Sequence, residues 1–190
     1  WLLHIGSTLF GSTNFAARFF PALFGCLGVI AVYFLAFMGF QNEKKAFVSS
    51  LILLSSGLYI GLSRTVFTDM IFSIFILFSL ASFYWGYSRN DRKGAWIVFF
   101  FIFSALAVLT KGPLGFMIPS LVVLMFLALR KDLGFLLCGY SLLGLGVFIV
   151  AAFPWYIFMI TRYGASFTHE YFYNDHVRRF LTAEHPKNDT

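Results

Sequence analysis

The stretch 104-SALAVLTKGPLGFMIPSLVV-123 decides the fold class of this chain. Lys111 is its only charged residue, and Gly112 and Pro113 follow directly. Proline breaks a helix from within, but at the first turn its missing N–H costs nothing. We therefore interpret the stretch as two apolar helices joined by a tight turn.

The composition extends this interpretation to the whole chain. Of 190 residues, 59% are hydrophobic, 21% are aromatic and 12% are charged, and the mean hydropathy is +0.82. Soluble domains carry about 25% charged residues. These values predict an integral membrane protein. The net charge of +6 then favours anionic lipid over nucleic acid as a partner. Cys26 and Cys138 lie in apolar runs, where thiols serve as packing residues.

Membrane-length apolar segments fill most of the chain. A spanning helix needs about 20 apolar residues, and six segments approach or exceed that length: Asn14–Phe40, Ala46–Ser63, Asp69–Tyr87, Gly94–Thr110, Pro113–Leu129 and Leu133–Ile160. A strand barrel is excluded because the segments lack alternation. The sequence predicts an all-α, polytopic membrane protein with about six transmembrane helices.

We assign residues 1–190 to part of one transmembrane domain. Residues 1–13 are too short to cross and are expected to form an interfacial segment. Residues 14–161 hold the spans, and residues 162–190 form a polar, aromatic loop.

The loops distribute the basic residues over the two sides of the membrane. One side receives Lys44, Lys45, Arg89, Arg92, Lys93, Arg130 and Lys131; the other receives Arg18, Arg64, Lys111, Arg162, Arg178, Arg179 and Lys187. The totals are equal, but orientation follows the short loops beside the spans. Without the tail charges Arg178, Arg179 and Lys187, the first side dominates. We predict that the first side is cytoplasmic.

Several reactive side chains fall on the predicted outer side. Lys111 is either a snorkelling cation favoured by the helix dipole or a ligand for an anion. Asp69 either caps its helix or serves a site together with Arg64. His176 lies near Glu170 and Asp175, but the three do not share one helical face. A solvated tail remains the alternative for these three residues.

Five stretches resemble bacterial membrane glycosyltransferases of the GT-C class, namely the aminoarabinose transferases of lipid A and, more distantly, protein O-mannosyltransferases. They are 14-NFAARFFPALFGCLGV-29, 63-SRTVFTDMIFSIFILFSLASFYWGY-87, 105-ALAVLTKGPLGFMIPSLVV-123, 154-PWYIFMITRYG-164 and 176-HVRRFLTAEHPKNDT-190. The "LTKGP" and "HVRRF" motifs are the most specific. The resemblance covers essentially the whole chain, in order.

The resemblance implies a multi-pass protein of the bacterial inner membrane with its active site facing the periplasm. Such an enzyme moves a sugar from a polyprenyl-phosphate donor to a lipid, glycan or protein hydroxyl. It must deprotonate the acceptor and stabilise charge on the leaving phosphate. The second task points to Lys111, with Arg64, Arg178 and Arg179 as further donor-phosphate ligands.

The remaining site assignments also follow from the resemblance. Asp69 is expected to support catalysis, and His176 is the nearest match to a ligand for a divalent metal. The family's catalytic aspartate precedes the segment that matches the start of this chain. We therefore expect the main base upstream of Trp1, and we expect this middle part of the enzyme to be inactive alone.

Two other classes of protein compete with the enzyme. A transporter or flippase for a lipid-linked anionic substrate would also use cations at one face, but it should carry charges deeper in its spans. A purely structural membrane subunit would not need Arg64, Asp69, Lys111 and His176 on one side.

Overall fold

The computed structural model describes residues 2–88, 93–137 and 139–168. Its elements are helical: α1 (Leu2–Phe10), α2 (Asn14–Phe40), α3 (Glu43–Ser55), α4 (Gly57–Arg64), α5 (Asp69–Ser88), α6 (Lys93–Lys111), α7 (Leu114–Leu129), a 3-10 helix η1 (Leu133–Leu137) and α8 (Gly139–Thr168). The chain divides into two compact units, Trp1–Ala151 and Ala152–Thr190. The all-α prediction is confirmed.

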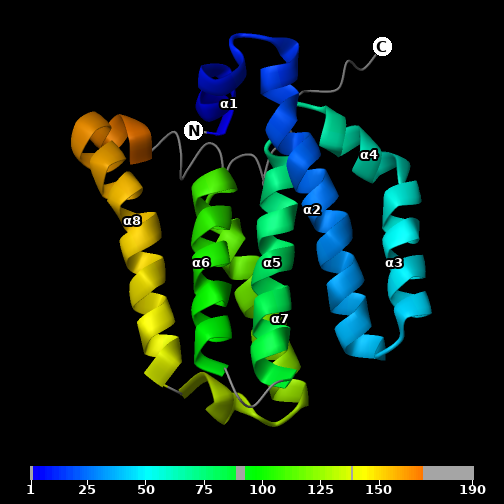
Figure 1. Ribbon diagram of the computed structural model, residues 1–190. Coiled ribbons are helices and arrows are strands. Elements are labelled where there is room, and N and C mark those ends of the chain that lie inside the picture. Colours follow the sequence, from blue (N-terminus) through cyan, green and yellow to red (C-terminus); the bar gives the residue numbers. More distant parts are fainter. Residues whose placement is uncertain (1, 89–92, 138, 169–190) are drawn as a thin grey trace, which may run out of the picture. The chain divides into compact units, whose positions relative to one another are not determined.

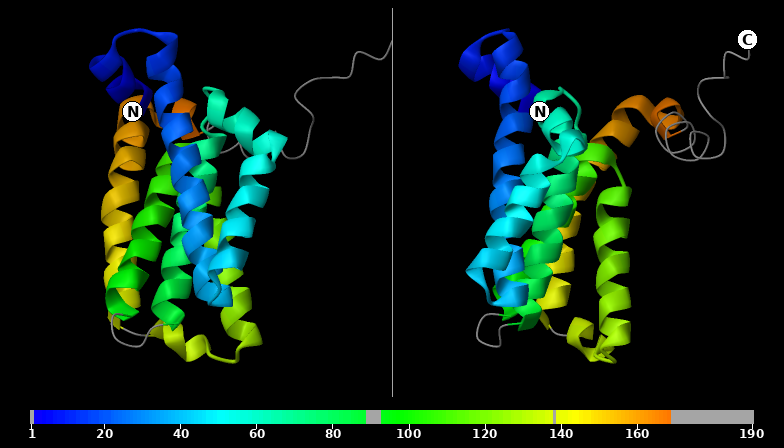
Figure 2. Two further views of the ribbon diagram at one scale, coloured as in Figure 1. Left: turned by 45° about the vertical axis from the view of Figure 1, so that its right-hand side comes forward. Right: turned by 90° about the vertical axis from the view of Figure 1, so that its right-hand side faces the viewer.

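Within the first unit, consecutive long helices run antiparallel (Figures 1 and 2). The α5–α6 hairpin lies at its centre, with α2 against α5 and α7 against α6. Ser79 and Ser104 are fully buried between α5 and α6, and their hydroxyl oxygens lie 2.8 Å apart. Ser79 Oγ also lies 3.1 Å from the Phe100 carbonyl oxygen, to which it donates. Small polar residues thus bring the two backbones together, as expected between helices in lipid.

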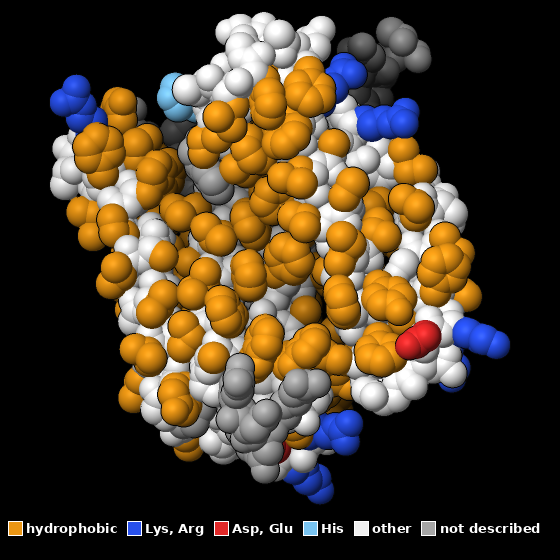
Figure 3. Space-filling view, in the orientation of Figure 1, with side chains coloured by type: hydrophobic (Ala, Val, Ile, Leu, Met, Phe, Trp, Pro, Cys, Tyr) orange, Lys and Arg blue, Asp and Glu red, His pale blue; other side chains and the backbone are white. Residues whose placement is uncertain are grey.

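The outer faces of the helices are apolar. Phe34, Ile52 and Leu58 expose 51%, 66% and 75% of their surfaces, respectively. Figure 3 shows hydrophobic side chains over most of one face, with Lys and Arg side chains mainly at its two ends. A water-soluble protein rarely exposes apolar patches of this extent, so the pattern fits helices embedded in lipid.

Length and composition identify four or five of the six expected spans among the described residues. Among the described residues, four helices are long and apolar enough to cross a membrane, or five if the bent α3–α4 pair is one span. α7 has 16 residues, which corresponds to about 24 Å against a hydrocarbon core of about 30 Å. The polytopic fold class is confirmed, and the six-span division remains a prediction.

Two expected spans differ from the helices observed. The segment Ala46–Ser63 is not one helix, because it bends by 64° between α3 and α4. The segment Leu133–Ile160 begins with the short η1, so the long helix starts only at Gly139 and then continues to Thr168. Gly164 has non-helical angles inside α8, with φ 56° and ψ −137°.

The N-terminal segment, expected to be interfacial, is helical over Leu2–Phe10. α1 packs on the start of α2, where Gly6 is buried. A Cβ atom at Gly6 would lie 2.7 Å from the Ala16 carbonyl oxygen, so only glycine allows this approach. Thr13 caps α2 by accepting the Ala16 N–H at 3.2 Å.

Candidate active-site end of the helix bundle

The ends of α5 and α6 bring together two charged residues that are 42 positions apart in the sequence. α5 begins at Asp69, and α6 ends at Lys111. The two helices are antiparallel neighbours, so the start of one lies beside the end of the other (Figure 1). An acid at a helix N-terminus and a base at a helix C-terminus each complement the local dipole.

Lys111 Nζ donates to Asp69 Oδ1 in an ion pair. The side chains of Lys111 and Asp69 are 46% and 38% exposed, respectively, so the pair is open to other ligands. The ammonium also lies 5.9 Å from the centroid of the Phe72 ring, a cation–π contact. An exposed pair of this kind contributes only about 0–1 kcal/mol to stability, so stability alone does not account for it.

Asp69 does not cap α5. Thr68 occupies the cap position, because its carbonyl oxygen accepts the Phe72 N–H at 2.9 Å, the first hydrogen bond of the helix. Asp69 is one residue further in, and its carboxylate is directed to Lys111. The capping interpretation of Asp69 is therefore wrong by one residue.

The turn after Lys111 has the geometry that its sequence suggested. Gly112 has a φ of 94°, a backbone conformation that residues with a side chain rarely adopt. Its N–H donates to the Val108 carbonyl at 2.8 Å, which closes α6. The Pro113 carbonyl accepts the Met117 N–H at 3.1 Å, and so begins the ladder of α7. The turn thus fixes the backbone that carries Lys111.

Gly115 lets α7 approach α6 just beyond this turn. A Cβ atom at Gly115 would lie 2.8 Å from the Ala107 carbonyl oxygen and closer still to the adjoining backbone atoms. Ala107 itself is fully buried. The spacing of Gly112, Pro113 and Gly115 therefore sets both the turn and the helix contact beyond it.

Arg64 is at the same end of the bundle but is not a partner of Asp69. It is the last residue of α4, five positions before Asp69, and is exposed. Within the described residues, the ion pair of Asp69 is with Lys111. Asp69 and Arg64 therefore form no ion pair among the described residues, and their joint role in a site stays a prediction.

A small hollow adjoins the ion pair in sequence and in space. Its volume is about 210 Å³, and α1, α2, α5, α6 and the α4–α5 connection line it. Thr68 and Thr110, the immediate neighbours of Asp69 and Lys111, are among its lining residues. Thr110 Oγ1 donates to the Leu106 carbonyl at 2.7 Å. The hollow therefore provides a confined, partly polar space beside the two charges.

The remaining predicted ligands cannot be placed. Arg178, Arg179 and His176 lie outside the described residues. In the described part of the chain, no group of three or more His, Cys, Asp and Glu side chains could hold a metal. The metal assignment of His176 stays a prediction.

Sequence reasoning selected Asp69 and Lys111 separately and missed that they pair. The signal was present in the pattern of spans: one residue opens a helix and the other closes the next helix along the chain. Phe72 was also missed. It lies one turn after Asp69 and contacts the Lys111 ammonium, and nothing in the sequence distinguishes it from the many other phenylalanines.

These features define a polytopic α-helical membrane protein with an accessible acid–base pair at one end of its helices. The chain belongs to the dolichyl-phosphate-mannose-protein mannosyltransferase family, whose sequence profile matches residues 1–169.

Relatives and solved structures agree with this family. A protein of Aquifex aeolicus is 32% identical over 184 residues, and an undecaprenyl phosphate-alpha-4-amino-4-deoxy-L-arabinose arabinosyl transferase of Proteus mirabilis is 28% identical over 183 residues. These matches cover 97% and 95% of this chain but 36% and 32% of the relatives. ArnT from Cupriavidus metallidurans, both apo and bound to undecaprenyl phosphate, matches with a TM-score of 0.83 and 26% identity over 93% of this chain. The chain spans about a third of the length of these proteins.

Proposed function

We propose that this chain is part of a membrane glycosyltransferase that transfers a sugar from a polyprenyl-phosphate donor to a hydroxyl of a lipid, glycan or protein. Membership of the mannosyltransferase family supports this reaction class. The similarity to named arabinosyl transferases and to ArnT bound to undecaprenyl phosphate supports the polyprenyl donor. The resemblance to the aminoarabinose transferases of lipid A supports lipid A modification as the proposed setting.

The observation that carries the proposal is the exposed Asp69–Lys111 ion pair at a helix turn. A lipid phosphate lies at the depth where a spanning helix ends, so the Lys111 ammonium is suitably placed to meet it. Charge grows on the phosphate as the glycosidic bond to it breaks, and a fixed cation stabilises that charge. Asp69 orients the ammonium and competes with the phosphate for it.

Arginine can hold a phosphate through two parallel hydrogen bonds, which lysine cannot do. We propose that Arg64, Arg178 and Arg179 supply such contacts to the donor phosphate. His176 is the proposed ligand if a divalent metal takes part.

We further propose that the protein lies in the bacterial inner membrane with the Asp69–Lys111 end facing the periplasm. The excess of basic residues in the short loops at the other end supports this orientation. The acid–base pair would then meet donors and acceptors presented at the outer face.

The positions of the charges favour the enzyme over the transporter. In the described spans, Arg18 and Arg162 lie deepest, yet each is within about two turns of a helix end. A flippase for an anionic lipid is expected to carry charges along the path through the membrane.

The proposal is tested in the full-length protein with Lys111→Met and Lys111→Arg. Loss of one charge-assisted contact costs roughly 1.5–3 kcal/mol, so kcat/KM of Lys111→Met for an undecaprenyl-phosphate aminoarabinose donor should fall about ten- to a hundredfold. Lys111→Arg keeps the charge and should lose less. Expression and melting temperature serve as controls. If Lys111→Met inserts normally and transfers the sugar at the wild-type rate, the donor-site assignment is wrong.

A further inference from the structure

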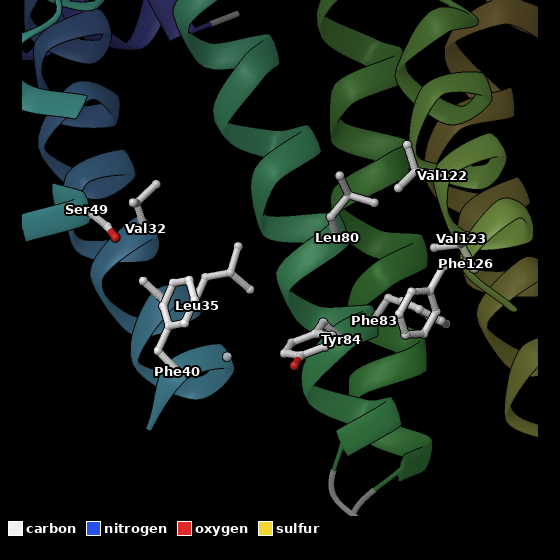
Figure 4. A pocket seen from close by; sticks show the side chains of 12 residues that line it. Val32, Leu35, Phe40, Ser49, Leu80, Phe83, Tyr84, Val122, Val123 and Phe126 are labelled. Atoms are coloured by element: carbon white, nitrogen blue, oxygen red, sulfur yellow. The ribbon is translucent and has the colours of Figure 1, made fainter. Parts of the chain in front are cut away.

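An apolar slot of about 490 Å³ opens between α2, α3, α5 and α7, at the end of the bundle opposite the Asp69–Lys111 pair. Leu35 and Phe40 of α2 lie across the slot from Leu80 and Tyr84 of α5 (Figure 4). Its volume falls within the range of about 300–1,000 Å³ typical of ligand sites. Its polar side-chain groups are the hydroxyls of Ser49 and Tyr84. Such a lining suits a hydrocarbon chain.

A second hollow of about 360 Å³ adjoins the slot near the α2–α3 turn. Phe40 and Ser49 line both hollows, so the two share a wall. The second hollow is otherwise lined by Lys44, Lys45 and Val48, and no carboxylate is among its lining residues. Lys45 Nζ lies 5.4 Å from the centroid of the Phe40 ring. The lysines therefore line the hollow that adjoins the apolar slot.

The local sequence holds the lysines in this place. Gln41 adopts the left-handed conformation at the end of α2, and Asn42 caps α3 by accepting the Lys45 N–H at 3.1 Å. Lys44 and Lys45 consequently lie in the first turn of α3, beside Glu43. Cations at a helix N-terminus oppose the helix dipole, but an anion bound there is stabilised by both the dipole and the ammonium groups.

From the shared wall and the charge complementarity, we infer that the two hollows together bind one anionic phospholipid. Its phosphate contacts Lys44 and Lys45, and an acyl chain occupies the slot beside Leu35 and Leu80. Basic residues next to a membrane span attract anionic lipid, and the slot adds a defined place for the chain. This site does not rest on the proposed transfer reaction, since its residues lie away from Asp69 and Lys111.

The test uses the full-length protein in nanodiscs of equal parts phosphatidylglycerol and phosphatidylcholine, followed by release into mild detergent and native mass spectrometry. The wild type should retain one phosphatidylglycerol in preference to phosphatidylcholine. In Lys44→Gln/Lys45→Gln, that retention should fall at least fivefold. Ala36→Phe places a ring in the slot wall and should lower retention similarly while the lysines remain.

Lys131→Gln is the matched control, because Lys131 is an exposed lysine at the same end of the bundle but lines neither hollow. Its retention should stay within twofold of the wild type. Equal losses in all variants would overturn the site, because they would show general charge attraction. Retention unchanged by Ala36→Phe would overturn it too, because another segment would then fill the slot. A loss in Ala36→Phe without one in the lysine variant would refute the headgroup contact.

Discussion

Lys111 and Asp69 lie at the ends of neighbouring helices, where each side chain meets the other as well as the dipole of its own helix. Lys111 was expected at a tight turn, and it is found there. Asp69 was expected either to cap its helix or to serve a site together with Arg64. Thr68 takes the cap position instead, and Asp69 pairs with Lys111. The ion pair between these two helix ends was not predicted. A sequence indicates where a helix ends, but not which side chain of the neighbouring helix lies beside that end.

If the Asp69–Lys111 pair serves catalysis, its variants should change kcat/KM far more than they change the free energy of unfolding. Because both side chains are more than one-third exposed, Asp69→Asn and Lys111→Met should each change the free energy of unfolding by less than about 1 kcal/mol. Their effects on kcat/KM should be much larger and should not add in the double variant. The measurement is a double-mutant cycle on turnover and melting. Losses of turnover that merely follow the losses of stability would contradict a catalytic role.

The Ser79–Ser104 hydrogen bond allows a second prediction for single residues. Ser79→Ala removes the contacts to Ser104 and to the Phe100 carbonyl, and should lower the free energy of unfolding by about 0.6–1.7 kcal/mol. Ser120→Ala is the control, since the buried Ser120 hydroxyl has no hydrogen-bond partner within the described residues. Its replacement should be neutral or stabilising. Denaturant titration in detergent compares the two, and equal effects would show that the Ser79 contacts add nothing.

At the scale of elements, hydrophobic length predicted where most helices lie. Asn14–Phe40 is one helix with the expected bounds, because Thr13 and Gln41 give clear start and stop signals. The break at Ser56 was missed because the apolar residues on both sides of Ser56 and Gly57 were treated as one span, although a Ser-Gly pair can mark a turn. Ser56 leaves the helical region with ψ 116°. The last span was expected to begin at Leu133, but its helix, α8, begins at Gly139. Hydropathy describes how readily residues enter an apolar environment. It does not distinguish a 3-10 helix such as η1 from an α-helix.

The α6–α7 hairpin depends on Gly115. In Gly115→Ala the new methyl group meets the backbone of Ala107 rather than a flexible side chain, and overpacking of this kind costs about 1–3 kcal/mol. The turn should shift with it, so donor turnover should fall even though Lys111 is intact. Gly146→Ala in α8 is the control, because its Cβ meets no atom within 4 Å. It should be neutral or stabilising. Equal melting temperatures for both variants would contradict the close approach.

At the scale of the whole molecule, composition and the order of spans were sufficient for the fold class, and the resemblance of five sequence stretches indicated the family. The site was predicted only in part. Lys111 and Asp69 lie together, whereas Arg178, Arg179 and His176 fall outside the described residues. Their roles depend on long-range placement, which local sequence patterns do not encode. The chain spans about a third of the length of its relatives.

The orientation of the bundle in the membrane yields the last prediction. Lys44 and Lys131 lie at one end of the helices, and Arg64 and Lys111 at the other (Figure 1). Because short loops rich in lysine and arginine stay in the cytoplasm, cysteines at positions 64 and 111 should react with an impermeant thiol reagent in cells with a permeabilised outer membrane. Cysteines at positions 44 and 131 should react only after lysis. The background variant lacks Cys26 and Cys138, and lysed cells show that each position is reactive. Labelling at 44 but not at 64 in unlysed cells would invert the topology. The acid–base pair would then face the cytoplasm, where the proposed periplasmic transfer could not take place.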